Sequence, residues 1–213
     1  MSDIKNIEQH YSLDERPFLE KVRGFCQLVD DRYSPYLTDF LNPREIQIVE
    51  ELAHYYNLKF FVSSTLESEE YGRVILAPEY YELDDDDFEI KRLEISYARQ
   101  FNKLTHPKVL GALINQLGLD RQVFGDIILD EEGRVQFSIA SHLASYAIMT
   151  ITKIGNVSVT LKEVSKDDWI SNQENYSQSF VLLSSMRLDN VLATVLNLSR
   201  SNALKLIASG KVK

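Results

Sequence analysis

The first part of the chain carries apolar side chains at helical spacing. Between residues 11 and 56 they recur every three or four positions, which places them on one helix face; the clearest run is Phe18, Val22, Phe25, Leu28 and Val29. A second helix begins after Asn42, which can cap it, with Pro43 at its first position and Glu45 able to reach back as in a capping box. We therefore expect this stretch to be helical.

Two short apolar runs then predict a strand pair. Residues 59–63 and 73–77 have strand composition, and the polar stretch 67–70 connects them. This first α+β unit, residues 1–84, ends at the acidic run 84–87. The run lacks the alternating ligands, the turn glycine and the closing glutamate of an EF-hand loop. We therefore interpret it as a solvated linker and not as a metal site.

The middle of the chain, residues 88–165, has the order strand, helix, strand, strand, helix, strand. The predicted strands are 89–97, 122–129, 134–140 and 156–164, and the predicted helices are 107–116 and 141–153. The segment 130–133 contains a glycine and is typical of a hairpin turn. This order indicates a ferredoxin-like domain, an arrangement that RNA-recognition domains also use.

The two faces of this predicted sheet differ in polarity. Leu93, Ile95 and Tyr97 share one face of the first strand, and Val135, Phe137 and Ile139 share one face of the third. The opposite face carries polar residues, namely Glu94, Ser96, Gln136, Ser138, Ser158 and Thr160. RNA-recognition domains stack bases on aromatic side chains of that face, and none is evident. We interpret the domain as a scaffold or a shape-reading domain.

Composition adds constraints on the class of protein. The chain has 213 residues, of which 44% are hydrophobic and 26% charged, so wholesale disorder is excluded. The start is polar, and no apolar run reaches the roughly 18 residues of a membrane span. Cys26 is the only cysteine, which excludes an internal disulfide. We expect a reduced, cytoplasmic protein without a membrane partner.

Charge is distributed unevenly along the chain. The net charge of −9 argues at first against nucleic acid, because phosphate binding depends on Lys and Arg. Residues 180–213, however, hold five basic residues and one acidic residue, while the other 179 hold 18 basic and 31 acidic. The tail is therefore +4 and the body −13.

The basic tail predicts two short helices. Leu188, Val191, Leu192, Val195 and Leu196 form one apolar stripe. The second helix is expected to be capped by Ser199, to turn Ala203, Leu206 and Ile207 inward, and to end at Gly210. Arg200 in its first turn opposes the helix dipole. Either it binds a phosphate at the helix N-terminus, or it pairs with a nearby carboxylate, and the sequence leaves both open.

These tail residues also carry a resemblance to a known domain. The pattern, which consists of Arg187, Leu188, Asp189, Val191, Leu192, Ala193, Ser199, Arg200, Ala203, Leu206, Ile207, Gly210, Val212 and Lys213, resembles the first half of the S-four RNA-binding domain. Upstream, residues 40–45, 111–113, 117–118, 121 and 125–127 are similar to the YlmH family, in which that domain ends a longer protein. The motifs together span nearly the whole chain.

The resemblance implies RNA binding without a known catalytic centre or cofactor. YlmH-family proteins are associated with the bacterial ribosome, where they are implicated in rescuing stalled large subunits that carry peptidyl-tRNA, and their genes neighbour cell-division genes. The resemblance makes Arg187, Ser199, Arg200, Lys205, Lys211 and Lys213 the RNA-facing candidates, and gives Asp189 and Gly210 a role in shaping the motif. The expected partners are ribosomal or transfer RNA and the large ribosomal subunit.

The chain departs from the family pattern in two places. Where the family usually has a basic stretch after the first domain's turn, residues 67–73 leave only Arg73 as a basic residue, which weakens the expectation of an RNA contact there. An S-four domain also normally continues past the position of Lys213. We therefore expect residues 180–213 to form only part of that domain.

An enzyme has little support in the sequence. The only Arg-Leu-Asp string, which in some pseudouridine synthases surrounds a catalytic aspartate, lies inside the binding motif at 187–189. His10, His54, His106 and His142 are scattered without metal-ligand spacing, and Cys26 lies on an apolar helix face. We therefore predict no catalytic, metal or cofactor site. The alternative to RNA binding is a protein-interaction adaptor linked to bacterial cell division.

Overall fold

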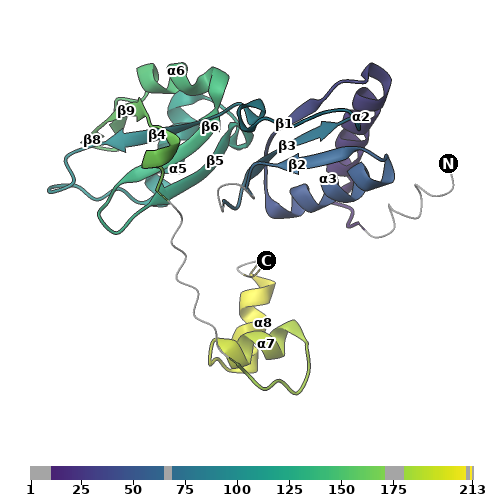
Figure 1. The fold of residues 1–213 in the computed structure, drawn as a ribbon. Coiled ribbons are helices and arrows are strands. Elements are labelled where there is room, and N and C mark those ends of the chain that lie inside the picture. The colour runs from purple at the N-terminus through teal and green to yellow at the C-terminus, as the bar shows by residue number, and fades with distance from the viewer. Residues whose placement is uncertain (1–10, 65–68, 171–179, 210–211, 213) are drawn as a thin grey trace. The chain divides into compact units, whose positions relative to one another are not determined.

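The structure is a computed structural model that describes residues 11–64, 69–170, 180–209 and 212. The chain forms two compact units, Met1–Gln173 and Glu174–Lys213. The described part of the first unit contains a three-stranded and a four-stranded antiparallel sheet with their helices and a small two-stranded hairpin, and that of the second contains a pair of short helices (Figure 1). The α+β class expected from the sequence is confirmed.

The N-terminal part of the first unit is a three-stranded sheet with two helices. Its elements are α2 (Arg16–Arg32), β1 (Tyr36–Leu41), α3 (Pro43–Tyr55), β2 (Lys59–Val62) and β3 (Gly72–Ala77). The strand order is β1-β3-β2, and both pairings are antiparallel. Helices α2 and α3 pack on this sheet through a buried cluster that includes Val22, Cys26 and Leu52.

The predicted strand pair and the predicted helix start are both found. The side chain of Asn42 accepts a hydrogen bond from the Glu45 backbone N–H at 2.9 Å, and Glu45 accepts one from the Asn42 backbone N–H at 2.9 Å. The expectation of helix throughout residues 11–56 is wrong, because β1 separates α2 from α3. In β1, buried Thr38 and Phe40 lie on either side of exposed Asp39, which is the alternation of buried and exposed residues typical of a β-strand.

The acidic run 84–87 is also more ordered than a linker. It forms most of a short 3-10 helix, η1 (Asp85–Phe88), which Asp84 caps by accepting from the Asp86 backbone N–H. Phe88 at its end is buried against Ile75 and Ala77. This run therefore connects the two sheets through a packed turn.

The remaining part of the first unit is a four-stranded sheet of ferredoxin-like topology. Its main elements are β4 (Ile90–Ser96), α5 (His106–Leu117), β5 (Phe124–Leu129), β6 (Val135–Ala140), α6 (Ser141–Thr150) and β9 (Thr160–Glu163). The order β5-β6-β4-β9 is antiparallel throughout, as a split βαβ arrangement requires. A turn with Gly133 at φ 78° joins β5 to β6, as predicted.

The last helix and strand are shorter than the sequence pattern indicated. α6 ends at Thr150 and not at residue 153, and β9 begins at Thr160 and not at 156. A small hairpin of β7 (Lys153–Ile154) and β8 (Val157–Ser158) occupies the interval, turning at Gly155 with φ 60°. Ile151, directly after α6, is buried in the main core, which explains why its apolar signal extended the predicted helix.

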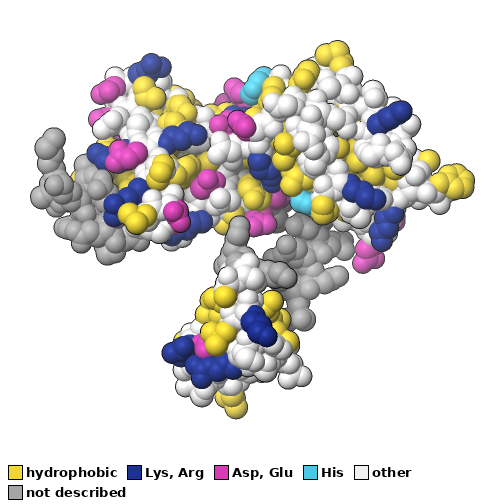
Figure 2. All heavy atoms as spheres, turned by 180° about the vertical axis from the view of Figure 1, so that it is seen from behind, with side chains coloured by type: hydrophobic (Ala, Val, Ile, Leu, Met, Phe, Trp, Pro, Cys, Tyr) yellow, Lys and Arg dark blue, Asp and Glu magenta, His cyan; other side chains and the backbone are white. Residues whose placement is uncertain are grey.

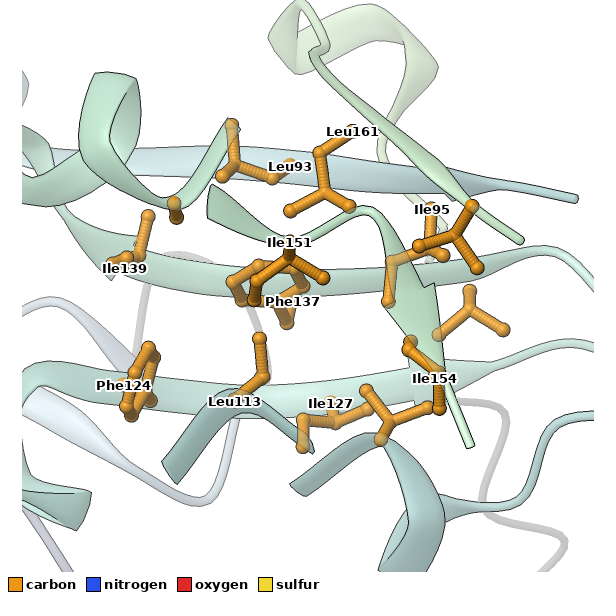
Figure 3. Close-up of a cluster of buried hydrophobic side chains, with 14 of the residues drawn as sticks. Leu93, Ile95, Leu113, Phe124, Ile127, Phe137, Ile139, Ile151, Ile154 and Leu161 are labelled. Atoms are coloured by element: carbon orange, nitrogen blue, oxygen red, sulfur yellow. The ribbon is translucent and has the colours of Figure 1, made fainter. Parts of the chain in front are cut away.

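The largest core lies between the four-stranded sheet and helices α5 and α6. Phe124, Phe137 and Ile139 from the sheet meet Leu113 from α5 and Ile151 from the end of α6 (Figure 3). Each of these side chains is at most 1% exposed. The apolar face predicted for the first and third strands is therefore the face that the helices cover.

The second unit contains the two helices that the tail pattern predicts, α7 (Leu188–Val195) and α8 (Arg200–Ala208). Short helix η3 (Lys166–Asp168) precedes the unit boundary. Ala203 is fully buried between the tail helices, as expected for an inward residue, whereas Leu206 and Ile207 are half-buried. The predicted apolar stripe is only partly covered, because Leu188, Val195 and Leu196 remain about half exposed within the described residues.

Candidate nucleic-acid interface

One buried carboxylate in the second unit holds two arginines. Asp189, in the first turn of α7, is 4% exposed. Its Oδ1 accepts a hydrogen bond from Arg187 Nε at 3.0 Å, and its Oδ2 accepts one from Arg200 Nε at 2.6 Å. Arg187 precedes α7 and Arg200 begins α8, so a single side chain joins the starts of both helices.

The two arginines remain accessible although they are paired. Their side chains are 67% and 61% exposed. Each uses Nε towards Asp189, so the Nη groups of Arg187 and Arg200, with four N–H donors each in the guanidinium fork, make no hydrogen bond within the described residues. Such forks suit bidentate binding of phosphate. Arg200 thus has the carboxylate partner that the sequence left as one alternative, and retains donors for the other.

The pKa of the Asp189 carboxyl reflects this arrangement. Hydrogen bonds from Arg200 and then Arg187 lower its pKa from 3.8 to about 2. The carboxylate is therefore charged at neutral pH and keeps both guanidinium groups oriented.

The other tail candidates lie close to these arginines in sequence. Ser199 caps α8, because its Oγ accepts from the Asn202 backbone N–H at 3.3 Å, as the pattern predicted. Lys205 is exposed on α8. Gly210, Lys211 and Lys213 lie outside the described residues. Figure 2 shows Lys and Arg side chains gathered on this unit beside exposed hydrophobic ones.

The polar face of the four-stranded sheet is covered by the chain itself. Arg92 and Ser138 on this face are at most 2% exposed. The Glu69 carboxylate, from the segment before β3, accepts hydrogen bonds from Arg92 and from Ser138 Oγ. Beside it, Asp126 on β5 accepts from the backbone N–H groups of Glu70 and Tyr71 at 2.5 and 3.3 Å. The N-terminal segment therefore occupies part of the face that RNA-recognition domains leave open.

A second segment covers a further part of that face. Trp169 follows η3, and the Arg92 guanidinium lies 4.3 Å from the centroid of its ring. The Ile170 backbone N–H donates to Gln136 Oε1 at 3.0 Å, and Gln136 Nε2 donates to the Asp168 carbonyl at 3.0 Å. Residues 168–170 therefore pack on the sheet. The centre of this face, with Arg92, Gln136 and Ser138, is thus a buried polar layer.

Ion pairing within this layer satisfies its charges. Glu94 on β4 accepts from Arg134 Nη2 at 2.7 Å and from Gln136 Nε2 at 2.9 Å. Burial alone raises the pKa of the Glu94 carboxyl, but these hydrogen bonds outweigh it and the pKa is lowered. The sequence contained one signal of this layer, because Arg92 and Glu94 alternate with apolar residues in a central strand. Nothing in the local pattern identified Glu69 as the partner of Arg92.

Arg73 has a structural role. Its Nε donates to the Thr38 carbonyl at 2.8 Å, and its Nη1 donates to the carbonyls of Phe88 and Glu89 at 2.9 and 3.1 Å. The residue is 5% exposed, and burial lowers the pKa of its guanidinium. It therefore joins β1 to the end of η1. Because Arg73 is the only basic residue of segment 67–73 and is buried, this segment presents no basic side chain to RNA.

Elsewhere in the described residues, the side chains that could bind a metal do not come together in a metal site. Within them, no three His, Cys, Asp or Glu side chains are placed to hold a metal ion, and His10 lies outside these ranges. Cys26 is fully buried, and this burial raises the pKa of its thiol to about 11. In the part of the chain that was described, no helix is both long and apolar enough to cross a membrane.

These features define an α+β protein with a ferredoxin-like domain and a separate helical unit that displays two oriented arginines. A family model described as "Putative RNA-binding domain in YlmH" matches residues 84–168, which contain that domain. Ribosome-associated protein quality control protein P2 of Bacillus subtilis is 32% identical over 210 residues, covering 99% of this chain and 81% of that protein. The structure of cell division protein ylmH from Streptococcus pneumoniae has a TM-score of 0.68 and 40% identity, covering 76% of this chain and 98% of that one.

The chain belongs to the YlmH family. The match over residues 84–168 is to an RNA-binding domain model, and the names of the family model and of the two relatives describe no catalysis.

Proposed function

We propose that this protein binds structured ribosomal or transfer RNA at the large ribosomal subunit, in quality control of stalled subunits that carry peptidyl-tRNA. Arg187, Arg200 and Lys205 are the RNA-facing side chains in the described residues, and Lys211 and Lys213 extend the set. Ser199 contributes as the cap of α8. Residues 1–84, 88–165 and 180–213 act as three modules, and the protein works without a catalytic centre or cofactor.

The observation that carries the proposal is the shared Asp189 carboxylate. It fixes two exposed guanidinium groups within residues 180–213, whose net charge is +4. Fixed, planar forks bind phosphate with less loss of side-chain entropy than free arginines do. The relative from B. subtilis, which is named for ribosome-associated quality control, supports the ribosomal context.

Charge distribution supports a division of labour within the chain. The remaining 179 residues carry −13, which disfavours unspecific contact with RNA. The centre of the polar sheet face of the middle domain is covered around Arg92 and Gln136, so its strands offer no stacking platform there. RNA contact is therefore assigned to the second unit.

The test is the salt dependence of binding to labelled ribosomal RNA. Arg200→Glu is expected to lower the affinity for RNA. It is also expected to reduce the magnitude of the slope of log K against log salt by about 1, the contribution of one phosphate contact. Arg32→Glu, which reverses an exposed arginine at the end of α2, is the matched control and is expected to change neither. An unchanged slope in Arg200→Glu argues against the tail as the contact.

A second candidate is a protein-interaction adaptor linked to cell division, which the name of the streptococcal relative favours. Sedimentation of the purified chain with ribosomes separates the two. Co-migration with large subunits supports RNA docking. Absence from every ribosomal fraction, even with peptidyl-tRNA-bearing subunits, supports the adaptor.

A further inference from the structure

The N-terminal part of the first unit contains a pocket that the proposed RNA contact does not use. It has a volume of about 330 Å³, near the lower limit for ligand sites. It is lined by Pro35, Leu37, Ile75, Tyr81, Asp86, Asp87 and Glu89. The pocket therefore lies between β1, β3 and the 3-10 helix η1.

The lining is apolar on one side and acidic on the other. Pro35, Leu37 and Ile75 supply the apolar part, and Ile75 belongs to a buried cluster that keeps it rigid. Asp87 is fixed, because it accepts from the Tyr81 hydroxyl at 2.5 Å.

The other two carboxylates of the lining are available. Asp86 and Glu89 are exposed and form no salt bridge within the described residues, although the charge of Asp86 acts on Lys91 and that of Glu89 acts on Arg73. Their neighbours are paired instead, since Asp85 contacts Lys166 Nζ at 3.3 Å. Two negative charges thus face solvent at the acidic side of an apolar pocket.

Two exposed tyrosines that pair with each other lie close in sequence to residues that line the pocket. The rings of Tyr33 and Tyr80 have centroids 5.1 Å apart, and the Tyr80 hydroxyl donates to the Tyr33 carbonyl at 2.7 Å. The two residues are 63% and 56% exposed. Tyr33 lies two residues before Pro35, and Tyr80 directly precedes Tyr81. Paired, exposed tyrosines are typical of protein-binding surfaces.

We propose that this pocket binds a lysine or arginine side chain of a protein partner, with the residues beside that side chain packing on Tyr33 and Tyr80. The long aliphatic stem of either basic residue fits along Pro35, Leu37 and Ile75. Its charged end then meets Asp86 and Glu89. Charge complementarity selects a basic protein segment, because the same two carboxylates repel the phosphates of RNA.

The probe is a fluorescent heptapeptide with one central arginine flanked by leucines, measured by anisotropy with the full chain. The matched peptide has glutamate in place of arginine. The arginine peptide is expected to bind, and the double substitution Asp86→Asn with Glu89→Gln is expected to weaken it by about three- to tenfold. The control pair Glu131→Gln with Glu132→Gln removes two exposed charges from the β5–β6 turn and leaves binding unchanged.

A second readout needs no substitution of the acidic residues. Chemical-shift changes of the Tyr81 ring on adding the arginine peptide to the native chain locate binding at the pocket. The proposal is overturned if the peptide does not bind, if the glutamate peptide binds equally well, if both double variants lose binding equally, or if an RNA oligonucleotide shifts the Tyr81 signals instead. None of these outcomes depends on Arg187 or Arg200, so the proposed RNA contact is tested separately.

Discussion

Arg200 Nε lies 2.6 Å from Asp189 Oδ2, and this contact joins the first turn of α8 to the first turn of α7. A cation at a helix N-terminus opposes the helix dipole. The Asp189 carboxylate offsets that unfavourable interaction, and because it also holds Arg187 it converts two flexible side chains into a fixed pair. The contact is thus both a helix–helix tie and a means of orienting guanidinium groups.

The first prediction concerns the fixed pair. Asp189→Asn keeps the side-chain size but removes the charge that orients both arginines, so affinity for ribosomal RNA is expected to fall about tenfold, as losing a charge-assisted hydrogen bond implies. Filter binding at constant salt measures the change. Asp167→Asn, an exposed acid on η3, serves as the control. An affinity equal to that of the native chain shows that orientation by Asp189 is not needed.

The second prediction concerns the titration of the same carboxyl group. The hydrogen bond from Arg200 is the largest cause of the low pKa of Asp189, about 2 against an ordinary 3.8. The folded pKa is below the unfolded value, so the stabilisation is complete above about pH 4 and is lost as pH falls towards 2.

Carbon-detected NMR of the Asp189 carboxyl measures this directly. In Arg200→Gln the pKa is expected to move up towards its ordinary value, with a smaller upward shift in Arg187→Gln. Lys205→Gln is the control, because it changes a charge on the same helix at a residue that forms no hydrogen bond or ion pair with Asp189 within the described residues, and it should leave the titration in place. Identical curves in native and Arg200→Gln chains contradict the pairing.

The third prediction concerns the buried polar layer. The side chains of Arg92 and Glu69 are 1% and 2% exposed, and they form an ion pair across the sheet face. Glu69→Gln removes the negative charge from this buried pair and is expected to lower the free energy of unfolding by about 3 kcal/mol. Glu70→Gln, at the exposed neighbouring position, should change it by less than about 0.5 kcal/mol. Urea unfolding monitored by Trp169 fluorescence compares the two, and equal midpoints contradict the assignment.

Much of the fold could be predicted because its signals are local. The capping box at Asn42 and Glu45, the hairpin turn at Gly133 and the alternation along the central strands are each determined by neighbouring residues. The order of strands and helices then restricts the middle domain to one topology. The tail helices follow in the same way from the spacing of their apolar residues.

The features that the sequence did not predict depend on contacts between segments far apart in the chain. The strand β1 lacks a signal strong enough to interrupt the helical periodicity around it, and its pairing with β3 decides its conformation. The sheet face is covered because Glu69 forms an ion pair with Arg92 and Trp169 packs on the same arginine. No local pattern contains these pairings. For the tail, the sequence left the partner of Arg200 undecided, and only the folded geometry provides Asp189.

The last prediction tests how tightly the two sheets of the first unit pack. A Cβ placed on Gly125 of β5 lies 2.7 Å from Phe40 Cε1 on β1 and 2.8 Å from Ser138 Cβ on β6. Both neighbours are buried and have little room to move, so Gly125→Ala is expected to lower the free energy of unfolding by about 1 to 3 kcal/mol through overpacking.

Gly111→Ala is the matched control for this change. Gly111 lies inside α5, and apart from its chain neighbours and the backbone of its own helix nothing lies within 4 Å of a Cβ placed there. Alanine favours helix over glycine by up to about 1 kcal/mol, so this variant should be as stable as the native chain or more stable. Thermal and urea unfolding of both variants give the comparison. If Gly125→Ala is neutral while Gly111→Ala is stabilising, Phe40 can move aside, and the packing of β1 against β5 is looser than these distances indicate.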